Sequence, residues 1–350
     1  MNTLEAIRHL PKAELHIHLL GAVRPKTLVQ IIKAEDIDTP YNSQEKMQKL
    51  FRYQNFGHFI EVYSQLIGLI QHERHFERLA HEVLEDCANQ NIRYVELSFS
   101  SIDHVREGLD FEDMLDAIDR GTERAHRDFG ILADIRIDLV RNFGPDTAMQ
   151  TLDAIERKPE NIVSVDIGGS EHKFPPQPFE SVYERAKQMG LHLVAHAGEA
   201  AGPKSIWDAI KYLDVERVGH AVSAIDDPDL MKYMKEHDIA IESCPVSNLR
   251  TRAVESMERH PIREFYDHGL LVTVNSDDPT LFQTNLNNEY KELHRELDFQ
   301  IDDLFQLSLN AVEASFLSEG QKEVLRKEFR ETYRNISEQL DLKRLKEQES

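Results

Sequence analysis

Short runs of apolar and β-branched residues recur along the chain, and longer stretches with apolar residues at helical spacing separate them. IRYVELSF (92–99) is typical of a buried strand, whereas FEDMLDAIDRGTERAHRDFG (111–130) is typical of an amphipathic helix. The eight predicted strands cover residues 13–19, 92–99, 131–140, 162–168, 192–198, 216–222, 239–245 and 270–278. Strands that alternate in this way with helices predict an α/β fold, a single (β/α)8 barrel of the TIM type.

Two segments add to this alternation. Residues 25–90 follow the first predicted strand and include the helical stretch FGHFIEVYSQLIGLI, so we expect a helical lid over the barrel mouth. A decoration with no part in the chemistry explains this segment equally well. Residues 320–350 predict a charged, peripheral helical tail. An open doubly wound sheet would need a Gly-rich phosphate turn after its first strand, which is lacking here, so we expect one barrel domain over residues 1–350.

The charge balance narrows the range of partners. The chain has 41 Lys and Arg against 63 Asp and Glu, a formal net charge of −22. So acidic a surface repels phosphate backbones and anionic lipids, and we expect neither nucleic acid nor a membrane as partner. The sequence contains no apolar run of transmembrane length, no signal-peptide core and only two cysteines, far apart. We therefore expect a cytoplasmic protein, of unknown oligomeric state.

Several predicted strands end in side chains that can bind a metal or transfer a proton. These side chains are His16 and His18 after the first strand, His196 and Glu199 after the fifth, His220 after the sixth, and Asp277 and Asp278 after the eighth. The fourth strand ends in the Gly-rich turn DIGGSE (166–171), where a backbone N–H could meet a ligand. Because catalytic groups of parallel barrels gather at the carboxyl ends of the strands, we expect these residues to face one another.

Three imidazoles and one carboxylate predict a hydrolytic zinc site with an open position for water. Its ligands would be His16, His18, His196 and Asp277, and one Zn²⁺ per chain would lower the pKa of bound water from 15.7 to about 7. Each motif alone is weak, because histidine pairs and Asp-Asp-Pro segments more often serve as core residues, caps or turns. Their joint occurrence at strand ends favours a metal, since without one these groups would carry heavy desolvation costs. Iron or cobalt in place of zinc stays open.

Five segments in this order resemble the adenosine deaminase family of zinc amidohydrolases. They are PKAELHIHLLGAVRPKTL (11–28), HAGE (196–199), RVGH (217–220), CPVSN (244–248) and VTVNSDDP (272–279). The resemblance extends from about residue 11 to NAVEASF (310–316), and it implies the same four metal ligands. It also implies that Glu199 protonates N1 of a purine and that His220 holds and deprotonates the attacking water. Asp278 would hydrogen-bond N7, and the backbone N–H of Gly169 would meet N3.

The resemblance implies hydrolytic deamination of the 6-amino group of an adenosine-type nucleoside, giving an inosine-type product and ammonia. Attack at C6 disrupts the purine ring, and protonation of N1 relieves the charge that develops. A carboxylic acid can supply this proton if a dry pocket raises its pKa. Other zinc amidohydrolase reactions, on lactams or phosphoesters, are less favoured. The acid Glu199 and the pair Asp277–Asp278 suit a heteroaromatic ring whose nitrogens are gripped.

Two positions depart from the family pattern. The family usually has Asp or Glu after HxHL, an acid that binds the ribose 5′-hydroxyl in nucleoside deaminases, whereas this chain has Leu20. Ser98 and Ser101 stand where relatives often have Arg and Pro. Because an apolar wall gives up the hydrogen bond to a hydroxyl, Leu20 suggests a substrate-binding role toward an apolar 5′-substituent, as in 5′-methylthioadenosine.

Other substrates and one other class of protein stay open. The thioether of S-adenosylhomocysteine and the carbon chain of 6-aminodeoxyfutalosine would also suit Leu20, and plain adenosine and adenine are alternative substrates. AMP is disfavoured because phosphate needs Arg, Lys or a nest of N–H groups. A metal-stabilised barrel used only for binding is the alternative outside enzymes. Such a protein would be expected to have lost a ligand or the acid, and this sequence retains all of them.

Overall fold

Eight parallel strands form the centre of the molecule, in the order in which they occur along the chain. The computed structural model describes residues 1–52, 56–157 and 161–348. The strands are β1 (Lys12–His18), β2 (Ile92–Phe99), β3 (Leu132–Asp138), β4 (Ile162–Asp166), β5 (His192–Ala197), β6 (Arg217–His220), β7 (Ala240–Ser243) and β8 (Val272–Val274). All eight predicted strands are therefore confirmed, with ends that differ by a few residues.

The sheet closes on itself where the chain after β8 meets β1. The backbone N–H of Asp277 donates to the carbonyl of His16 at 3.0 Å, and the N–H of His18 donates to the carbonyl of Asp277 at 2.8 Å. Each of the other strands pairs in parallel with the next. These bonds complete a barrel, so the predicted (β/α)8 fold is confirmed.

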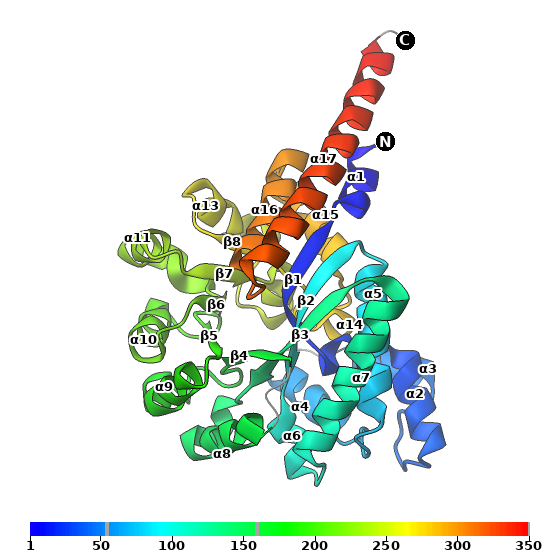
Figure 1. Ribbon diagram of the computed structural model, residues 1–350, viewed down its shortest axis with the longest axis vertical. Coiled ribbons are helices and arrows are strands. Elements are labelled where there is room, and N and C mark those ends of the chain that lie inside the picture. The colour runs from blue at the N-terminus through cyan, green and yellow to red at the C-terminus, as the bar shows by residue number, and fades with distance from the viewer. Residues whose placement is uncertain (53–55, 158–160, 349–350) are drawn as a thin grey trace.

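Helices surround the strands on the outside (Figure 1). The α-helices are α1 (Thr3–His9), α2 (Pro25–Ala34), α3 (Gln44–Leu50), α4 (Phe56–Ile67), α5 (His75–Ala88), α6 (Ser101–Arg106), α7 (Phe111–Phe129), α8 (Gly144–Arg157), α9 (Glu180–Gln188), α10 (Pro203–Leu213), α11 (Pro228–Glu236), α12 (Pro245–Thr251), α13 (Ile262–Asp267), α14 (Pro279–Phe282), α15 (Leu286–Glu296), α16 (Ile301–Ala314) and α17 (Glu319–Gln348). Short 3-10 helices are η1 (Leu20–Ala22), η2 (Arg141–Phe143), η3 (Gln177–Phe179), η4 (Val222–Asp226) and η5 (Met257–Arg259). In the described chain, no helix is both long enough and apolar enough to cross a bilayer.

Local sequence explains where the helices begin and end, as α7 illustrates. The carboxylate of Asp110 accepts the backbone N–H of Asp113 at 3.0 Å and caps the first turn. Gly130 ends the helix in the left-handed conformation, with φ of 72°. Gly121, in the middle, lets α5 pack closely, because a Cβ there would come within 2.5 Å of the carbonyl of Glu77.

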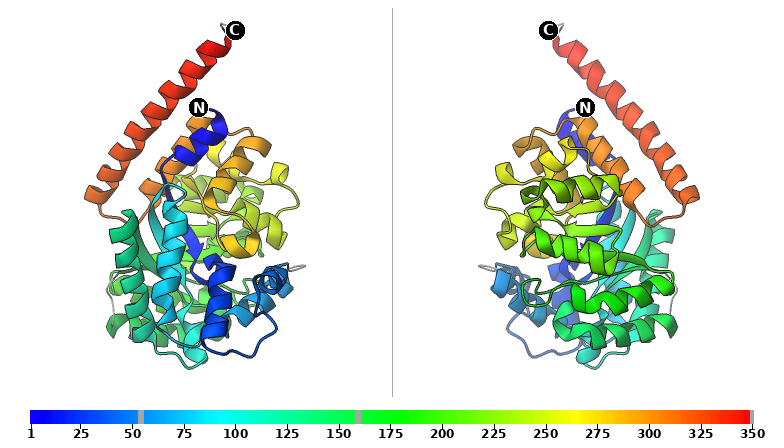
Figure 2. Two further views of the ribbon diagram at one scale, coloured as in Figure 1. Left: turned by 90° about the vertical axis from the view of Figure 1, so that its right-hand side faces the viewer. Right: turned by 90° about the vertical axis from the view of Figure 1, so that its left-hand side faces the viewer.

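The helical insertion and the helical C-terminal extension are both present. The segment between β1 and β2 contains α2 to α5, and Figure 2 shows α2 to α4 at the end of the barrel away from α1. Residues 319–348 form the single helix α17, which projects beyond the barrel (Figure 1). The carboxyl end of β1, and with it the predicted metal ligands, therefore lies on the side that α4 covers.

The first strand is less regular than its sequence suggests. Its pairing with β2 shifts register between Glu14 and Ile17. The N–H of Leu15 bonds to the side-chain oxygen of Asn275 at 2.9 Å, and its carbonyl accepts Nη2 of Arg136 at 2.7 Å. Two side chains thus satisfy the backbone groups that the ladder leaves free, directly before the first predicted ligand.

Candidate active site

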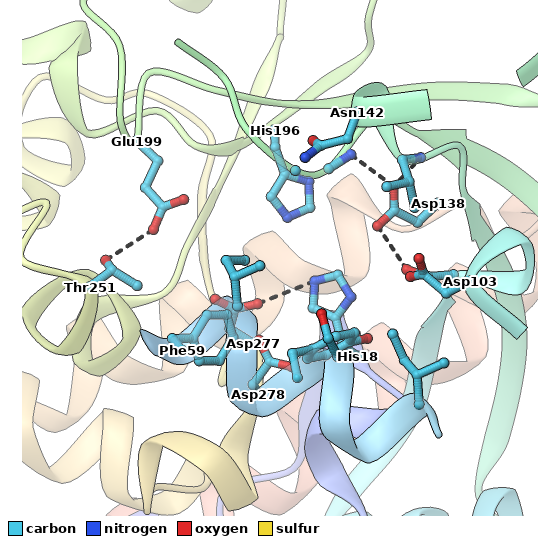
Figure 3. A pocket seen from close by; sticks show the side chains of 18 of the residues that line it. His18, Phe59, Asp103, Asp138, Asn142, His196, Glu199, Thr251, Asp277 and Asp278 are labelled. Carbon is cyan, nitrogen blue, oxygen red and sulfur yellow. Dashed lines mark hydrogen bonds and ion pairs between the residues drawn. The ribbon is translucent and has the colours of Figure 1, made fainter. Parts of the chain in front are cut away.

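A cavity of about 230 Å³ lies at the carboxyl ends of the strands, and α4 forms one of its walls. Glu199 and Thr251 lie at one end of the cavity, and Asp103 and Asp138 lie at the other (Figure 3). Imidazole and carboxylate groups from β1, β5 and the chain after β8 lie between these ends. Titratable groups that converge in one partly enclosed cavity are typical of an enzyme active site.

The four residues predicted as metal ligands come together beside this cavity. One ligand atom from each of His16, His18, His196 and Asp277 lies within 4.8 Å of every other. Oδ1 of Asp277 is 3.4 Å from Nε2 of His16 and 3.3 Å from Nε2 of His18. Nε2 of His16 is buried and makes no hydrogen bond with the described part of the chain. Imidazole nitrogens and a carboxylate that converge in this way fit a zinc ion, which would satisfy the orphaned nitrogen.

Two residues of the site have strained backbone conformations. His220 and Asp277 have φ of 64° and 62°, in a region that non-glycine residues rarely adopt. Glycine occupies two positions next to the site at which a Cβ atom would come too close to a site side chain. At Gly21 a Cβ would come within 1.7 Å of Oδ1 of Asp278, and at Gly219 it would come within 3.1 Å of the His16 ring. The glycines of LLGA and RVGH thus allow a close approach to the site.

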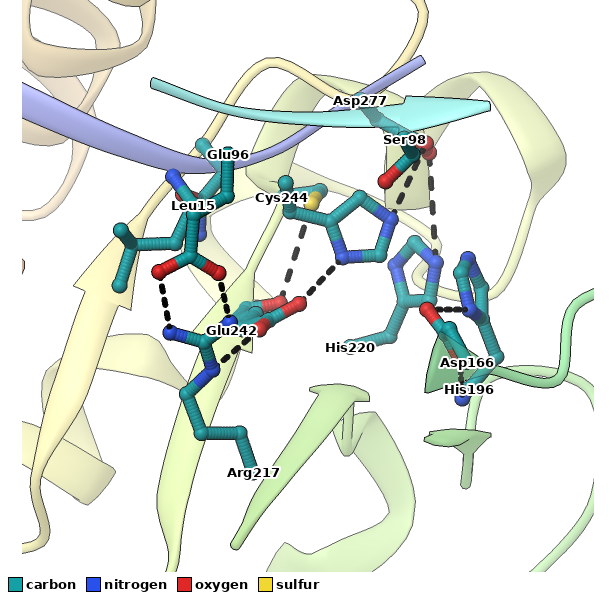
Figure 4. Close-up of polar contacts among 12 residues, drawn as sticks. Leu15, Glu96, Ser98, Asp166, His196, Arg217, His220, Glu242, Cys244 and Asp277 are labelled. Atoms are coloured by element: carbon teal, nitrogen blue, oxygen red, sulfur yellow. Dashed lines mark hydrogen bonds and ion pairs between the residues drawn. The ribbon is translucent and has the colours of Figure 1, made fainter. Parts of the chain in front are cut away.

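Two of the histidine rings each have a buried carboxylate next to Nδ1. Nδ1 of His16 is 2.7 Å from Oε2 of Glu242, and Nδ1 of His196 is 2.9 Å from Oδ2 of Asp166 (Figure 4). A carboxylate that accepts a hydrogen bond from Nδ1–H keeps the proton on that nitrogen and leaves Nε2 of the same ring free to bind a metal. Neither acid is among the site residues predicted from the sequence. They are charged residues in otherwise apolar predicted strands, which is the signal that found the histidines.

Two buried arginines hold Glu242 in turn. Arg136 and Arg217 each have a nitrogen 2.8 Å from its carboxylate. Burial would raise the pKa of Glu242, but the charges of both arginines lower it well below its usual range. Ser98 accepts a hydrogen bond from Nε of Arg136 at 3.0 Å, so this small residue of β2 lies beside an arginine from β3.

Glu199 and His220 are placed to handle protons. Burial, reinforced by the charge of Asp277, raises the pKa of Glu199 to about 7. Its Oε2 is 3.7 Å from Nε2 of His220, and its Oε1 accepts the hydroxyl of Thr251 at 3.0 Å. Burial lowers the pKa of His220 to about 4, and its Nδ1 lies 3.1 Å from the amide nitrogen of Asn248, which orients the ring. At neutral pH the cavity therefore holds a carboxyl that can be protonated beside a neutral imidazole.

Asp278 and Gly169 also line the cavity. Burial and the neighbouring charge of Asp277 raise the pKa of Asp278 well above its usual range, and its Oδ1 is buried without a hydrogen bond in the described chain. Gly169 has φ of 103°, and a Cβ there would come within 2.4 Å of Oδ1 of Asn142, which accepts the N–H of Ser170. The glycine turn is thus held against η2.

Leu20 lies beside the cavity and does not line it. Its side chain is 6% exposed and borders a small hollow next to the main cavity. Tyr63, Ser100 and Asp103 border both spaces and separate Leu20 from the centre of the site. Of the predicted site residues, the structure therefore brings all but His16 and Leu20 to the cavity wall, and His16 stands directly behind it.

Comparisons of the chain with a family model and with known proteins agree on one family. Residues 11–332 match the model of the adenosine deaminase family. The chain is 38% identical over 319 residues to an aminodeoxyfutalosine deaminase of Streptomyces avermitilis, which covers 90% of this chain and 89% of that protein. It is 33% identical over 323 residues to an adenine deaminase of Acinetobacter baylyi, which covers 92% of this chain and 97% of that protein.

A solved structure shows the same architecture with a metal. An amidohydrolase from Burkholderia ambifaria with bound zinc superimposes with a TM-score of 0.90 at 27% identity, over 98% of this chain and 96% of that one. The fold, the convergent ligand set and the extent of the family match agree with one another. The chain belongs to the adenosine deaminase family and is an aminohydrolase of that type.

Proposed function

We propose that the protein hydrolyses the 6-amino group of an adenosine-type purine nucleoside, giving an inosine-type product and ammonia. The observation that carries the proposal is the Glu199 carboxyl, with its pKa raised to about 7, in one cavity with the convergent imidazoles and Asp277. A general acid is most effective when its pKa lies near the working pH. A carboxyl that can donate a proton beside a hydrolytic metal centre suits attack on a ring whose nitrogen must be protonated.

Each residue has a defined task in this reaction. His16, His18, His196 and Asp277 would hold one Zn²⁺, which supplies Lewis-acid activation of water when bound. Glu199 protonates N1 of the purine, and His220 holds and deprotonates the attacking water. Asp278, whose raised pKa keeps it protonated, donates a hydrogen bond to N7. The N–H of Gly169 donates to N3. These contacts orient C6 and exclude bulk water from the ring.

The proposed substrate carries an apolar group at its 5′ carbon, such as the thioether of 5′-methylthioadenosine. Leu20 stands where the family usually has an acid. Phe59 and Ile67 of α4 line the cavity with apolar side chains. A second candidate is 6-aminodeoxyfutalosine, favoured by the 38% identical relative that acts on it. Initial rates with both compounds, adenosine, S-adenosylhomocysteine, adenine and AMP test the proposal. Failure of every nucleoside would contradict it.

Changing Leu20 to aspartate should reverse the preference at the 5′ position. If the apolar residue at position 20 favours an apolar 5′-substituent, wild type should favour 5′-methylthioadenosine over adenosine by about 10–200-fold in kcat/KM. In Leu20→Asp the carboxylate can accept a bond from a 5′-hydroxyl but stands unpaired against a thioether. Leu20→Met, which stays apolar, should keep the wild-type order. A wild-type preference for adenosine, together with a change of less than about threefold in Leu20→Asp, would show that Leu20 does not set specificity.

Removing the Thr251 hydroxyl should move the alkaline limb of the pH profile. Glu199 acts when protonated, so kcat/KM should fall as pH rises through its pKa of about 7. The bond from Thr251 stabilises the carboxylate and lowers that pKa. Thr251→Val should therefore raise it and shift the limb upward by about one pH unit. Profiles of both proteins measure the shift, and an unmoved limb would assign it to another group.

A further inference from the structure

Two carboxylates at the end of the cavity remote from Glu199 have no task in the mechanism above. Asp138 ends β3, and Asp103 lies in the first turn of α6. Both line the cavity, and Figure 3 shows them across it from Glu199 and Thr251. In a purine, N9 carries the sugar and lies across the ring system from N1. A nucleoside with N1 at Glu199 therefore places its ribose toward Asp103 and Asp138.

The two acids differ in how their oxygens are satisfied. Asp138 accepts the N–H groups of Gly168 and Val140 at 2.8 and 3.0 Å and the hydroxyl of Ser100 at 3.0 Å. Asp103 accepts no hydrogen bond from any described residue, although burial and the charge of Asp138 raise its pKa to about 7. A largely buried carboxyl without a donor is a group that a ligand hydroxyl would satisfy.

The charges around the cavity also favour a neutral sugar over a phosphate at this end. Among the described residues that line it there is no lysine or arginine. Arg106, whose charge lowers the pKa of Asp103, is exposed and has its guanidinium 4.4 Å from the ring centre of Phe143. One exposed cation against two largely buried carboxylates leaves this end negative. A phosphate at C5′ would be repelled, whereas a neutral sugar would not.

Resting on the proposed function, we propose that Asp103 accepts a hydrogen bond from the 2′- or 3′-hydroxyl of the ribose, and that Asp103 with Asp138 excludes 5′-phosphorylated nucleosides. The subsite selects a nucleoside over both the free base adenine, which offers it no hydroxyl, and AMP. Asp103 is thus a specificity-determining residue at the opposite end of the cavity from the chemistry.

The test compares kcat/KM for adenosine, 2′-deoxyadenosine, 3′-deoxyadenosine and AMP in wild type and two variants. In wild type, loss of one of the two hydroxyls should cost about tenfold or more. In Asp103→Ala that same penalty should shrink to less than about threefold. Asp103→Asn keeps the shape and removes the charge, so it should narrow the preference for adenosine over AMP by about tenfold.

Glu107→Gln is the matched control, because Glu107 is an exposed acid at the other end of α6 and does not line the cavity. It should leave every ratio within about twofold of wild type, since exposed charges are screened. Equal rates for both deoxynucleosides and adenosine in wild type would overturn the proposal. So would a hydroxyl penalty that survives in Asp103→Ala, or an AMP ratio unmoved in Asp103→Asn. Wild type inactive on all four compounds and also on 5′-methylthioadenosine and 6-aminodeoxyfutalosine would instead contradict the proposed deamination.

Discussion

Replacing His196 with alanine should remove most of the bound metal and, with it, the activity. We expect about one divalent ion per chain in the purified wild-type protein. His196 supplies one of the four convergent ligand atoms, and its Nδ1 lies 2.9 Å from Oδ2 of Asp166, on the part of the ring away from Nε2. Loss of one neutral nitrogen from a four-ligand set leaves a site too weak to retain zinc through purification.

The matched control for this variant is His192→Ala. His192 lies on the same strand, β5, but pairs with Glu216 outside the cavity. Elemental analysis of both variants after gel filtration gives metal per chain, and initial rates give activity. His192→Ala should keep its metal. Full zinc content in His196→Ala would show that this histidine is not a ligand, and the same experiment applies to His16, His18 and Asp277.

Replacing Glu199 with glutamine should leave the metal in place and cost roughly 10²–10⁴ in kcat, the usual worth of a positioned general acid. The amide is nearly isosteric with the carboxyl and can keep the contact to Thr251, so the cavity should retain its shape. What it cannot do is deliver a proton to a ring nitrogen.

Metal content separates this effect from damage to the site. In Glu199→Gln the zinc per chain should equal that of wild type, and circular dichroism should be unchanged. A lower kcat with a nearly unchanged KM is the expected pattern, because the lost interaction is made in the transition state. Near-normal turnover would mean that the proton reaches the ring by another route.

The barrel could be predicted from the sequence because strands of a parallel barrel are buried on both faces and appear as apolar runs. The candidate ligands were visible for the same reason, since a polar residue at the end of such a run is conspicuous. By the same criterion, Asp138 at the end of β3 is a candidate site residue, although the prediction from the sequence does not include it. Asp103 carries no such signal, because it lies in a short helix whose position depends on how the chain folds back after β2.

The sequence does not reveal which side chains pair with one another to orient the metal ligands. Glu242 of β7 meets His16 of β1 and Arg136 of β3 across the barrel, and no sequence spacing relates such distant positions. The break in β1 at Leu15 has the same origin, since the side chains that cause it come from β3 and the chain after β8. The hollow beside Leu20 has the same origin, because Tyr63 of α4 and Asp103 of α6 lie between Leu20 and the cavity centre.

The most direct test of the central claim is deamination in ¹⁸O-labelled water. The metal-loaded protein is incubated with adenosine, 5′-methylthioadenosine and 6-aminodeoxyfutalosine in turn, and the products are analysed by mass spectrometry alongside an ammonia assay. The account predicts that at least one nucleoside yields its 6-oxo product with one ¹⁸O atom at C6 and one ammonia per turnover. Recovery of all three unchanged, or a product without ¹⁸O at C6, would contradict it.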